Sequence, residues 1–423
     1  MQRKISVNFG NLLLSLSEIM DLASPILVQH QQRTAFIAWE IGKVAGLKND
    51  VLEKIFIAAL MHDVGAISVE EKVAIHNFEE NDLEFHCIRG EVLTQKVPQF
   101  KNVSKIIRYH HKEWQTWDEP IGTPHVLASQ IVLLADYIER LIDRNKYILH
   151  YNQEIIDKVL PLAGKIVHPH IIDYFMETSK REEFWLDLVS SRLYPHLLRH
   201  GPYWNVEIDF DEISEIAEVI RNIIDFRSRF TAAHSSRVAA CSEILSRMFG
   251  LTEHEVKLMK LAGDFHDIGK LIVPNSILEK PDKLTKEEFA VMRCHTYYTY
   301  HVISTIGGIQ HIAEWAAYHH EKMDGSGYPF HCKAEEISTC SRILTVADMF
   351  VAMAEDRPYR EGMKKEEIIK IITDSVSNNK LDKRIVDLLF GNYDEIISYV
   401  KEKQSLTDEF YRSKFAVIGK EQA

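Results

Sequence analysis

Several features that would point to other protein classes are scarce in this 423-residue sequence. It has only five cysteines and no Cys-x-x-Cys pair, which disfavours a disulfide framework and a thiolate-ligated zinc site. No stretch approaches 18 uninterrupted apolar residues and the N-terminus has no apolar signal core, so we expect a cytoplasmic protein with no membrane partner. The formal net charge of −12 argues against binding long nucleic acid.

Alternation of apolar and polar residues, which is typical of strands, is also scarce. Apolar residues instead recur at helical spacing, as between residues 213 and 224. Thr252-x-x-Glu255 and Thr285-x-x-Glu288 match capping boxes at helix starts, and Gly250 matches a helix stop. These patterns predict an all-α fold. We expect the apolar stripe at 213–224 to lie in the core or in a contact between two helices. A contact between two copies of the chain in a homodimer is the alternative.

The most informative pattern is an internal repeat of histidines and aspartates. In both copies the first His precedes a His-Asp pair by 32 residues, and a later His precedes a His-His pair by 24 residues. The first copy consists of His30, His62, Asp63, His86, His110, His111 and Asp136, and the second of His234, His266, Asp267, His295, His319, His320 and Asp348. The repeat predicts two equivalent helical domains, at 1–190 and 206–423, joined by a linker at 191–205 that contains Pro195, Gly201 and Pro202.

Each copy supplies five imidazoles and two carboxylates, a set that suits divalent transition metals. Seven groups exceed what one ion needs, but they fit two ions that share a bridging carboxylate. Iron or manganese is expected first, with nickel, cobalt or zinc as alternatives, and the first copy can hold two more ions. Two metals about 3.5–4 Å apart are a common device for cleaving phosphate esters, because they generate a nucleophilic hydroxide at neutral pH.

The second copy also carries a longer motif. His266-Asp267-Ile-Gly-Lys270 is followed by His319-His320, then by Gly-Ser-Gly-Tyr328-Pro, and finally by Arg357-Pro-Tyr-Arg360. This order resembles the HD-GYP phosphodiesterases, a branch of the HD metal-dependent phosphohydrolases. The first copy resembles the same superfamily but lacks the Gly-Tyr-Pro signature. The resemblance implies two tandem HD-type helical domains. It also implies that a hydroxide bridging two metals in the C-terminal domain hydrolyses a cyclic dinucleotide, either cyclic di-GMP or 3',3'-cyclic GMP-AMP.

The resemblance assigns roles to single residues. It implies that Asp267 bridges the two ions and that Lys270 assists catalysis near the scissile phosphate. The first ion would be held by His234, His266, Asp267 and Asp348, the second by Asp267, His295, His319 and His320, and the ligand by Tyr328, Arg357 and Arg360. Some family members bind a third metal through a Glu four residues before the first His. Phe230 occupies that position here, so two metals are expected.

Alternatives remain open at two levels. The first copy matches Lys270 with Ala66, and Arg357 and Arg360 with Asn145 and Ile148. It is therefore expected to be a metal-bearing regulatory domain, or else a second hydrolase acting on another substrate such as the linear product. For the whole chain, the alternatives are an HD-type phosphohydrolase of mononucleotides and a receptor that binds cyclic dinucleotides without turnover.

Overall fold

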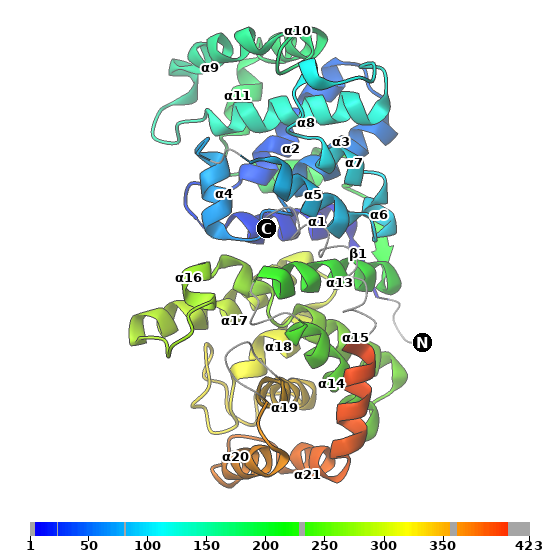
Figure 1. Cartoon of the computed structure of the whole chain (residues 1–423), viewed down its shortest axis with the longest axis vertical. Coiled ribbons are helices and arrows are strands. Elements are labelled where there is room, and N and C mark those ends of the chain that lie inside the picture. The colour runs from blue at the N-terminus through cyan, green and yellow to red at the C-terminus, as the bar shows by residue number, and fades with distance from the viewer. Residues whose placement is uncertain (1–4, 23, 80–81, 228–232, 356–361, 405–423) are drawn as a thin grey trace. The chain divides into compact units, whose positions relative to one another are not determined.

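The computed structural model describes residues 5–404 apart from 23, 80–81, 228–232 and 356–361. The described chain is almost entirely helical, as predicted, and its one sheet there is a two-stranded ribbon (Figure 1). The chain divides into two compact units, Ser6–Asp209 and a second unit made up mainly of the chain from Phe210 onwards. Over the described ranges, no helix is both long and apolar enough to cross a membrane.

The first unit begins and ends with the two strands of the ribbon, which pair antiparallel with Val7 opposite Ile208. Its elements are β1 (Ser6–Asn8), α1 (Phe9–Asp21), α2 (His30–Val44), α3 (Asn49–Met61), α4 (Val69–His76), α5 (Glu84–Thr94), α6 (Pro98–Lys101), α7 (Ser104–Arg108), η1 (Trp114–Thr116), α8 (Pro124–Arg140), η2 (Ile148–His150), α9 (Asn152–Val159), η3 (Leu160–Leu162), α10 (Pro169–Thr178), α11 (Glu182–Leu188), α12 (Leu193–His200) and β2 (Glu207–Asp209).

The second unit repeats the order of the main helices. Its elements are α13 (Phe210–Arg227), α14 (His234–Phe249), α15 (Glu253–Phe265), η4 (Ile268–Ile272), α16 (Asn275–Leu278), α17 (Lys286–Ile306), α18 (Gln310–Ala317), η5 (Tyr318–His320), α19 (Thr339–Ala354), α20 (Lys365–Ser377) and α21 (Lys383–Gly391). Both predicted capping boxes are present, at the starts of α15 and α17. Gly250 ends α14 with φ of 91°, a left-handed conformation that favours glycine.

The sequence repeat corresponds to a structural repeat. His30 and His234 are the first residues of α2 and α14, and each follows a residue in the left-handed conformation, Gln29 at φ 64° and Ala233 at φ 70°. Neither helix has a side-chain cap from that preceding residue. The His-Asp pairs begin directly after α3 and α15, the partner helices of α2 and α14.

A buried aspartate from the preceding helix supplies the missing cap in both units. Asp21 accepts the backbone N–H of Gln31 at 2.9 Å, and Asp225 accepts that of Ser235 at 3.1 Å. Burial raises the pKa of Asp21 to about 7 and that of Asp225 to about 6. These caps hold the helix end that carries the first histidine of each site.

The segment predicted as a linker at 191–205 differs in the structure. It contains helix α12, which packs within the first unit through the fully buried side chain of Leu193 and the buried Leu197. Pro195 lies in the first turn, where a missing N–H breaks no helical hydrogen bond. The ring of Tyr203 then packs edge-on against Phe9, with the ring centroids 5.0 Å apart. Pro195 and Gly201 here lie at the start and at the end of a packed helix, and the domain bounds at 190 and 206 stay predictions.

Candidate metal centres

The glycine two residues after each His-Asp pair allows two helices to approach closely. A Cβ at Gly65 would lie 2.0 Å from the carbonyl oxygen of His86, and one at Gly269 would lie 1.9 Å from that of His295. Any side chain would therefore force α5 or α17 away from the His-Asp pair. The glycine brings the third histidine of each set against the first carboxylate.

Half of the ten histidines in the two sets are oriented by their own backbone. In five of them Nδ1 lies within hydrogen-bonding distance of the carbonyl oxygen three residues earlier, so that Nδ1 carries the proton and Nε2 is left for the site. These contacts are His62 to Ala59 (2.9 Å), His110 to Ile107 (2.6 Å), His266 to Gly263 (2.8 Å), His295 to Met292 (2.6 Å) and His319 to Ala316 (2.6 Å). A fixed Nε2 lone pair is what a metal ligand requires.

The first histidine of each set is held by a buried glutamate that the sequence analysis missed. His30 Nδ1 lies 2.5 Å from Glu139 Oε2, and His234 Nδ1 lies 3.2 Å from Glu355 Oε2. Glu139 lies one turn beyond Asp136 on α8, whereas Glu355 follows the last residue of α19. His76, which resembles an ordinary core histidine in the sequence, also reaches Glu139, with Nε2 3.4 Å from Oε2.

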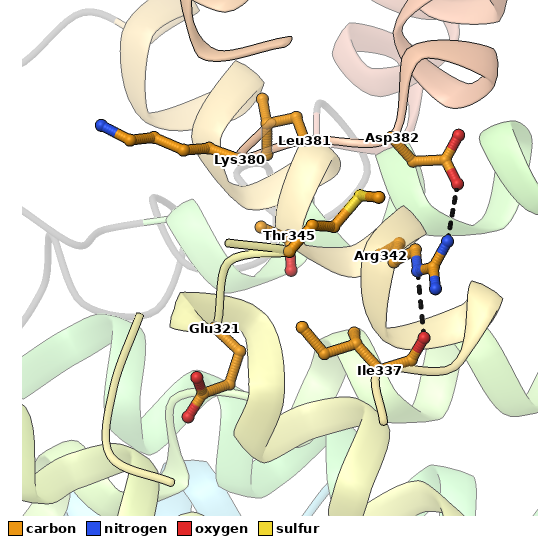
Figure 2. Close-up of a pocket in the computed structure, with 8 residues that line it drawn as sticks. Glu321, Ile337, Arg342, Thr345, Lys380, Leu381 and Asp382 are labelled. Carbon is orange, nitrogen blue, oxygen red and sulfur yellow. Dashed lines mark hydrogen bonds and ion pairs between the residues drawn. The ribbon is translucent and has the colours of Figure 1, made fainter. Parts of the chain in front are cut away.

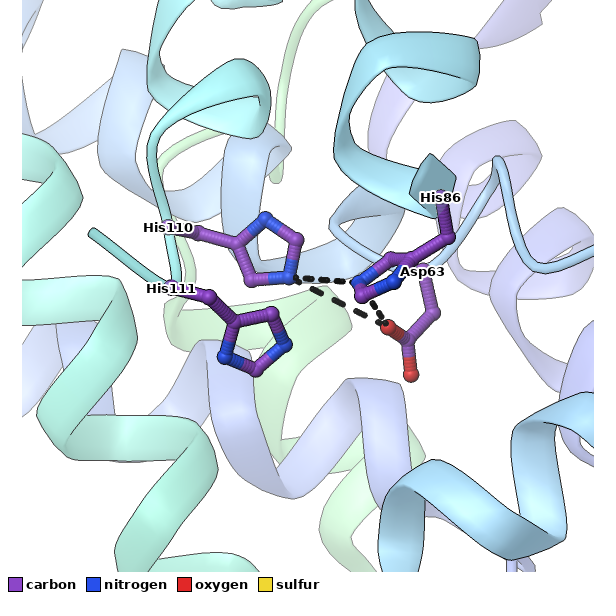
Figure 3. A group of neighbouring side chains, drawn as sticks. All are labelled: Asp63, His86, His110 and His111. Atoms are coloured by element: carbon purple, nitrogen blue, oxygen red, sulfur yellow. Dashed lines mark hydrogen bonds and ion pairs between the residues drawn. The ribbon is translucent and has the colours of Figure 1, made fainter. Parts of the chain in front are cut away.

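In the first unit the ligand atoms gather around the two oxygens of Asp63. The Nε2 atoms of His30 and His62 are 3.3 Å apart, and each lies 3.4 Å from Asp63 Oδ2. On the other side, Asp63 Oδ1 lies 3.6 Å from His86 Nε2 and 4.0 Å from His110 Nε2 (Figure 3). Four tetrahedral donors about 2.1 Å from one ion lie about 3.4 Å from one another. The spacing therefore matches two ion-sized sites that share one carboxylate.

Asp136 lies with the group around Asp63 Oδ2, and His111 lies with the group around Asp63 Oδ1. Asp136 Oδ1 lies 3.5 Å from His30 Nε2 and 3.6 Å from His62 Nε2. The ring of His111 lies beside that of His110, with the centroids 4.1 Å apart, as Figure 3 shows. Every predicted residue of the first set is thus in one cluster.

The second unit has the same arrangement with a more open side. Asp267 Oδ2 lies 3.2 Å from His266 Nε2, and Asp267 Oδ1 lies 3.6 Å from His295 Nε2 and 3.9 Å from His319 Nε2. Asp348 joins the first side, with Oδ1 3.1 Å from His234 Nε2. Its Oδ2 lies 3.9 Å from His320 Nδ1. All seven predicted ligands of the second set therefore converge as well.

The chemistry of both clusters fits divalent cations. The atoms Asp63 Oδ1, Asp136 Oδ1, His266 Nε2 and Asp267 Oδ1 are buried without a hydrogen-bond partner, which is costly unless another group binds them. Burial lowers the pKa of His295 to about 3 and keeps its imidazole neutral, as ligation requires. Burial would raise the pKa of Asp267, but the neighbouring His266 and Lys270 hold it well below its usual range. Despite burial, the neighbouring Glu355 and Asp348 raise the pKa of His234 to about 10, so ligation there requires loss of a proton. Imidazoles around charged carboxylates form a ligand set for Mn, Fe, Co, Ni or Zn.

Lys270 and Tyr328, two of the predicted catalytic and ligand-binding residues, lie at this second cluster. Lys270 Nζ is 2.5 Å from Asp267 Oδ2, and its side chain is 17% exposed. The ring of Tyr328 lies beside that of His320, with the centroids 4.9 Å apart. Arg357, Arg360 and Phe230 lie outside the described residues, so their predicted roles stay predictions.

The loop that carries Tyr328 is held by Glu321, which the sequence analysis also missed. Its carboxylate is buried and accepts the backbone N–H groups of Phe330 at 2.7 Å, His331 at 3.1 Å and Cys332 at 3.1 Å. Burial raises the pKa of this carboxyl group, while the three N–H donors favour its charged form. A Cβ at Gly327 would lie 2.4 Å from the Cα of Glu321, which explains the glycine before Tyr328.

The far end of the same loop is tied to the helical core. A small cavity behind the loop is lined by Glu321, Thr345 and Leu381, among others. Figure 2 shows Arg342 of α19 at its edge, with Nε donating to the carbonyl oxygen of Ile337 and Nη1 paired with Asp382, both at 3.0 Å. The loop is therefore fixed at both ends, which positions Tyr328.

A substitution at Glu321 tests this support. In Glu321→Gln one acceptor oxygen becomes an N–H₂ group that faces backbone donors, so at least one buried N–H loses its partner. We expect the free energy of unfolding to fall by about 2 kcal/mol and kcat/KM for the cognate substrate to fall about 10-fold. Denaturant unfolding and steady-state kinetics measure the two effects. Glu335→Gln, at an exposed position of the same loop, is the matched control, and equal behaviour of the two variants would contradict this role.

The first unit lacks a lysine equivalent to Lys270 and the Gly-Tyr-Pro loop, and it has an arginine beside its last aspartate instead. Ala66, at the position that matches Lys270, is buried, and Arg140 instead contacts Asp136, with Nη1 3.2 Å from Oδ2. The same guanidinium donates to the carbonyl oxygens of Ile75 and His76. The Asp136 side chain is consequently 3% exposed, compared with 12% for Asp348. The cation nearest this metal cluster is already engaged by protein groups.

Comparison with known proteins agrees with this geometry. The HD domain family matches residues 27–141 and 218–385, which together make up more than half of the chain. The chain belongs to the HD domain family. Each match contains one complete set of seven ligands, so the predicted tandem of HD domains is confirmed.

Three relatives and one solved structure show how far the similarity extends. The chain is 27% identical to the 3'3'-cGAMP-specific phosphodiesterase 1 of Vibrio cholerae over 92% of both chains. It is 26% identical to phosphodiesterase 3 of that organism, over 71% of this chain and 65% of the relative. A cyclic di-GMP phosphodiesterase of Thermotoga maritima is 34% identical over 48% of this chain and 53% of its own length. The crystal structure of a cyclic GMP-AMP specific phosphodiesterase from V. cholerae has the same fold, with a TM-score of 0.65 at 22% identity, over 92% of this chain and 98% of that one.

Proposed function

We propose that this tandem HD-domain protein is a metal-dependent phosphodiesterase that hydrolyses a cyclic dinucleotide, cyclic di-GMP or 3',3'-cyclic GMP-AMP, in its C-terminal domain. The observation that carries the proposal is the carboxylate of Asp267, placed between two groups of imidazoles and beside the ammonium group of Lys270. The likeness to a 3'3'-cGAMP-specific phosphodiesterase across both domains supports the choice of substrate. A mononucleotide phosphohydrolase and a receptor without turnover are the alternatives.

The residues of the second set would hold two divalent ions, with Asp267 between them. Iron or manganese suits the mixture of imidazole and carboxylate. When bound, such ions lower the pKa of water and neutralise charge on a phosphodiester. Backbone and glutamate contacts keep four of these imidazoles aimed inwards, those of His266, His295, His319 and His234.

Lys270 is placed to act on the substrate itself. Its ammonium group lies on the partly exposed side of the cluster, so it can donate to a phosphoryl oxygen as negative charge develops there. Tyr328, held by the loop above His320, closes the same side and would contact the ligand. Glu355 and Arg237 stand behind His234, with Arg237 Nη1 3.2 Å from Glu355 Oε2, and would keep that ligand oriented.

For the N-terminal domain we propose two bound metals without turnover of cyclic dinucleotides. Support comes from Ala66 at the position of Lys270 and from the engaged guanidinium of Arg140 over Asp136. A phosphodiester at this cluster would have to displace Arg140 from Asp136 and from two backbone carbonyls. Hydrolysis of the linear product is the competing role for this domain.

The experiment that tests the proposed function is turnover of a substrate panel by the full chain with Mn²⁺ or Fe²⁺. The panel contains cyclic di-GMP, 3',3'-cyclic GMP-AMP, cyclic di-AMP and guanosine mononucleotides, with products separated by chromatography. Cleavage of a cyclic dinucleotide supports the proposal. Cleavage of mononucleotides alone favours the mononucleotide hydrolase, and tight binding without any product favours the receptor.

The role of Lys270 gives a further prediction. In Lys270→Met the metal ligands are unchanged, but the cation beside the phosphoryl group is gone. We expect kcat to fall about 100-fold, with bound metal retained, as measured by steady-state kinetics and by metal analysis. Lys283→Met, at an exposed lysine in the following loop, is the control. Loss of metal together with activity would show that Lys270 acts on the cluster, and undiminished kcat would exclude it from catalysis.

A further inference from the structure

An exposed group on α17 lies next to the Tyr328 loop and has no role in the metal cluster. It consists of Phe289 and Arg293, one helical turn apart and on the same helix as His295. The Phe289 ring packs edge-on against that of Tyr328, with the centroids 5.9 Å apart at 84°. The Arg293 guanidinium lies 5.7 Å from the Phe289 centroid and 5.8 Å from that of Tyr328.

The group is continuous with the site. Tyr328 contacts both the ring of His320, a predicted metal ligand, and the ring of Phe289. Moving outwards from the cluster, one therefore meets His320, then Tyr328, then Phe289 and Arg293. A nucleotide with its phosphate at the metals would, through its ribose, bring its base to these rings, whereas a group bonded directly to the phosphate would stay nearer the metals.

Phe289 and Arg293 remain available to such a molecule. Phe289 is 44% exposed, so part of its ring is open to a ligand. Arg293 is exposed, and within the described ranges its guanidinium makes no hydrogen bond or ion pair. An open aromatic ring beside an unpaired, planar cation combines the two elements that bind a nucleobase, a stacking surface and a forked donor.

We propose that Phe289, Arg293 and the Tyr328 ring form the subsite for a guanine base of the cyclic dinucleotide. The inference rests on the proposed function, because the phosphate at the metals places the base. The Phe289 ring stacks on the purine, the Tyr328 ring meets its edge, and the Arg293 guanidinium donates to O6 and N7 of guanine, the acceptor pair that a bidentate arginine reads. Arg293 thus determines base preference without contacting the metals.

The test compares Phe289→Ala and Arg293→Ala with wild type in the full, metal-loaded chain. Three substrates are used, namely cyclic di-GMP, its 7-deazaguanine analogue, which lacks N7, and bis(4-nitrophenyl) phosphate, which reports the metal site. Phe289→Ala is expected to lower kcat/KM for cyclic di-GMP about 10-fold and to change the small diester less than twofold. Arg293→Ala is expected to remove the preference of wild type for cyclic di-GMP over the deaza analogue.

Matched controls lie on the same helix. Tyr297 is also 44% exposed, but its ring contacts Tyr298 and His301 and does not reach Tyr328, so Tyr297→Ala should behave as wild type. Lys286→Ala controls for removal of an exposed cation. Equal losses on the small diester, or no change with cyclic di-GMP, would overturn the subsite. Equal losses by Arg293→Ala on both cyclic substrates would assign the guanidinium to phosphate and overturn the base contact.

Calorimetric binding of cyclic di-GMP to the same variants separates failure of the subsite from failure of the proposed function. If wild type cleaves neither cyclic dinucleotide but binds cyclic di-GMP about 10-fold more tightly than Phe289→Ala does, the proposed turnover fails and the subsite stands. If wild type cleaves cyclic di-GMP while both variants bind it equally well, the subsite fails and the function stands. Absence of both binding and cleavage overturns both.

Discussion

Replacement of Asp267 by alanine is expected to abolish hydrolysis of cyclic dinucleotides. Its two carboxylate oxygens face two different groups of imidazoles, with Oδ2 3.2 Å from His266 Nε2 and Oδ1 3.6 Å from His295 Nε2. Asp348 lies mainly with His234 and His266 and reaches the second group only through Oδ2, 3.9 Å from His320 Nδ1. Removal of the bridge should release both ions and lower kcat/KM at least about 1000-fold.

Three measurements on the Asp267→Ala chain check this expectation. Metal analysis should show the loss of about two ions per chain, and turnover of cyclic di-GMP should fall to background. Chelation of wild type should reproduce the loss, and added Mn²⁺ should restore activity to wild type but not to the variant. Asp63→Ala, the equivalent change in the other domain, is the matched control. Undiminished turnover by Asp267→Ala would show that the chemistry was assigned to the wrong domain.

The clustering of the candidate metal ligands could be predicted from the sequence because metal binding restricts residue type and spacing together. His30 and His234 begin equivalent helices, and the His-Asp pairs end their partner helices, so a constant spacing along the chain corresponds to a constant position in space. Chemistry then restricts the side chains to imidazole and carboxylate. The repeat of the same seven residue types in both halves of the chain supports the prediction further, since a chance pattern would not recur in the same order.

The supporting residues could not be predicted in this way. Glu139 and Glu355 both hold the first histidine but lie at different distances from the last aspartate, one on α8 and one after α19. A carboxylate need only reach Nδ1, and several backbone positions satisfy that requirement. Glu321 accepts hydrogen bonds from backbone N–H groups, which every residue type except proline has, so the sequence does not indicate its partners. Phe289 and Arg293 can be related to the site only because the folded loop places Tyr328 beside them. Residues that act through long-range contacts therefore appear only in the structure.

Replacement of Asp63 by alanine should show what the N-terminal domain contributes. The two oxygens of Asp63 face two groups of imidazoles as those of Asp267 do, so with the proposed two ions in each domain the variant should lose about two of about four ions per chain. Ligands that bind only the folded state stabilise it by about 4 kcal/mol when present at about 1,000 times their dissociation constant. For a unit of about 200 residues, losing that contribution lowers the unfolding midpoint by about 10 °C. Calorimetry and metal analysis of the variant measure both effects.

The same variant separates the two roles left open for this domain. If the domain binds metal without turnover, Asp63→Ala should cleave cyclic di-GMP with an unchanged product distribution, because Lys270, Tyr328 and the second cluster are intact. If the domain hydrolyses the linear product, the variant should instead accumulate linear dinucleotide while the cyclic substrate disappears at the wild-type rate. The guanidinium of Arg140, engaged by Asp136 and by backbone carbonyls, and the buried Ala66 at the position of Lys270 favour the first outcome. Accumulation of the linear product would contradict that reading and make the protein a two-step hydrolase.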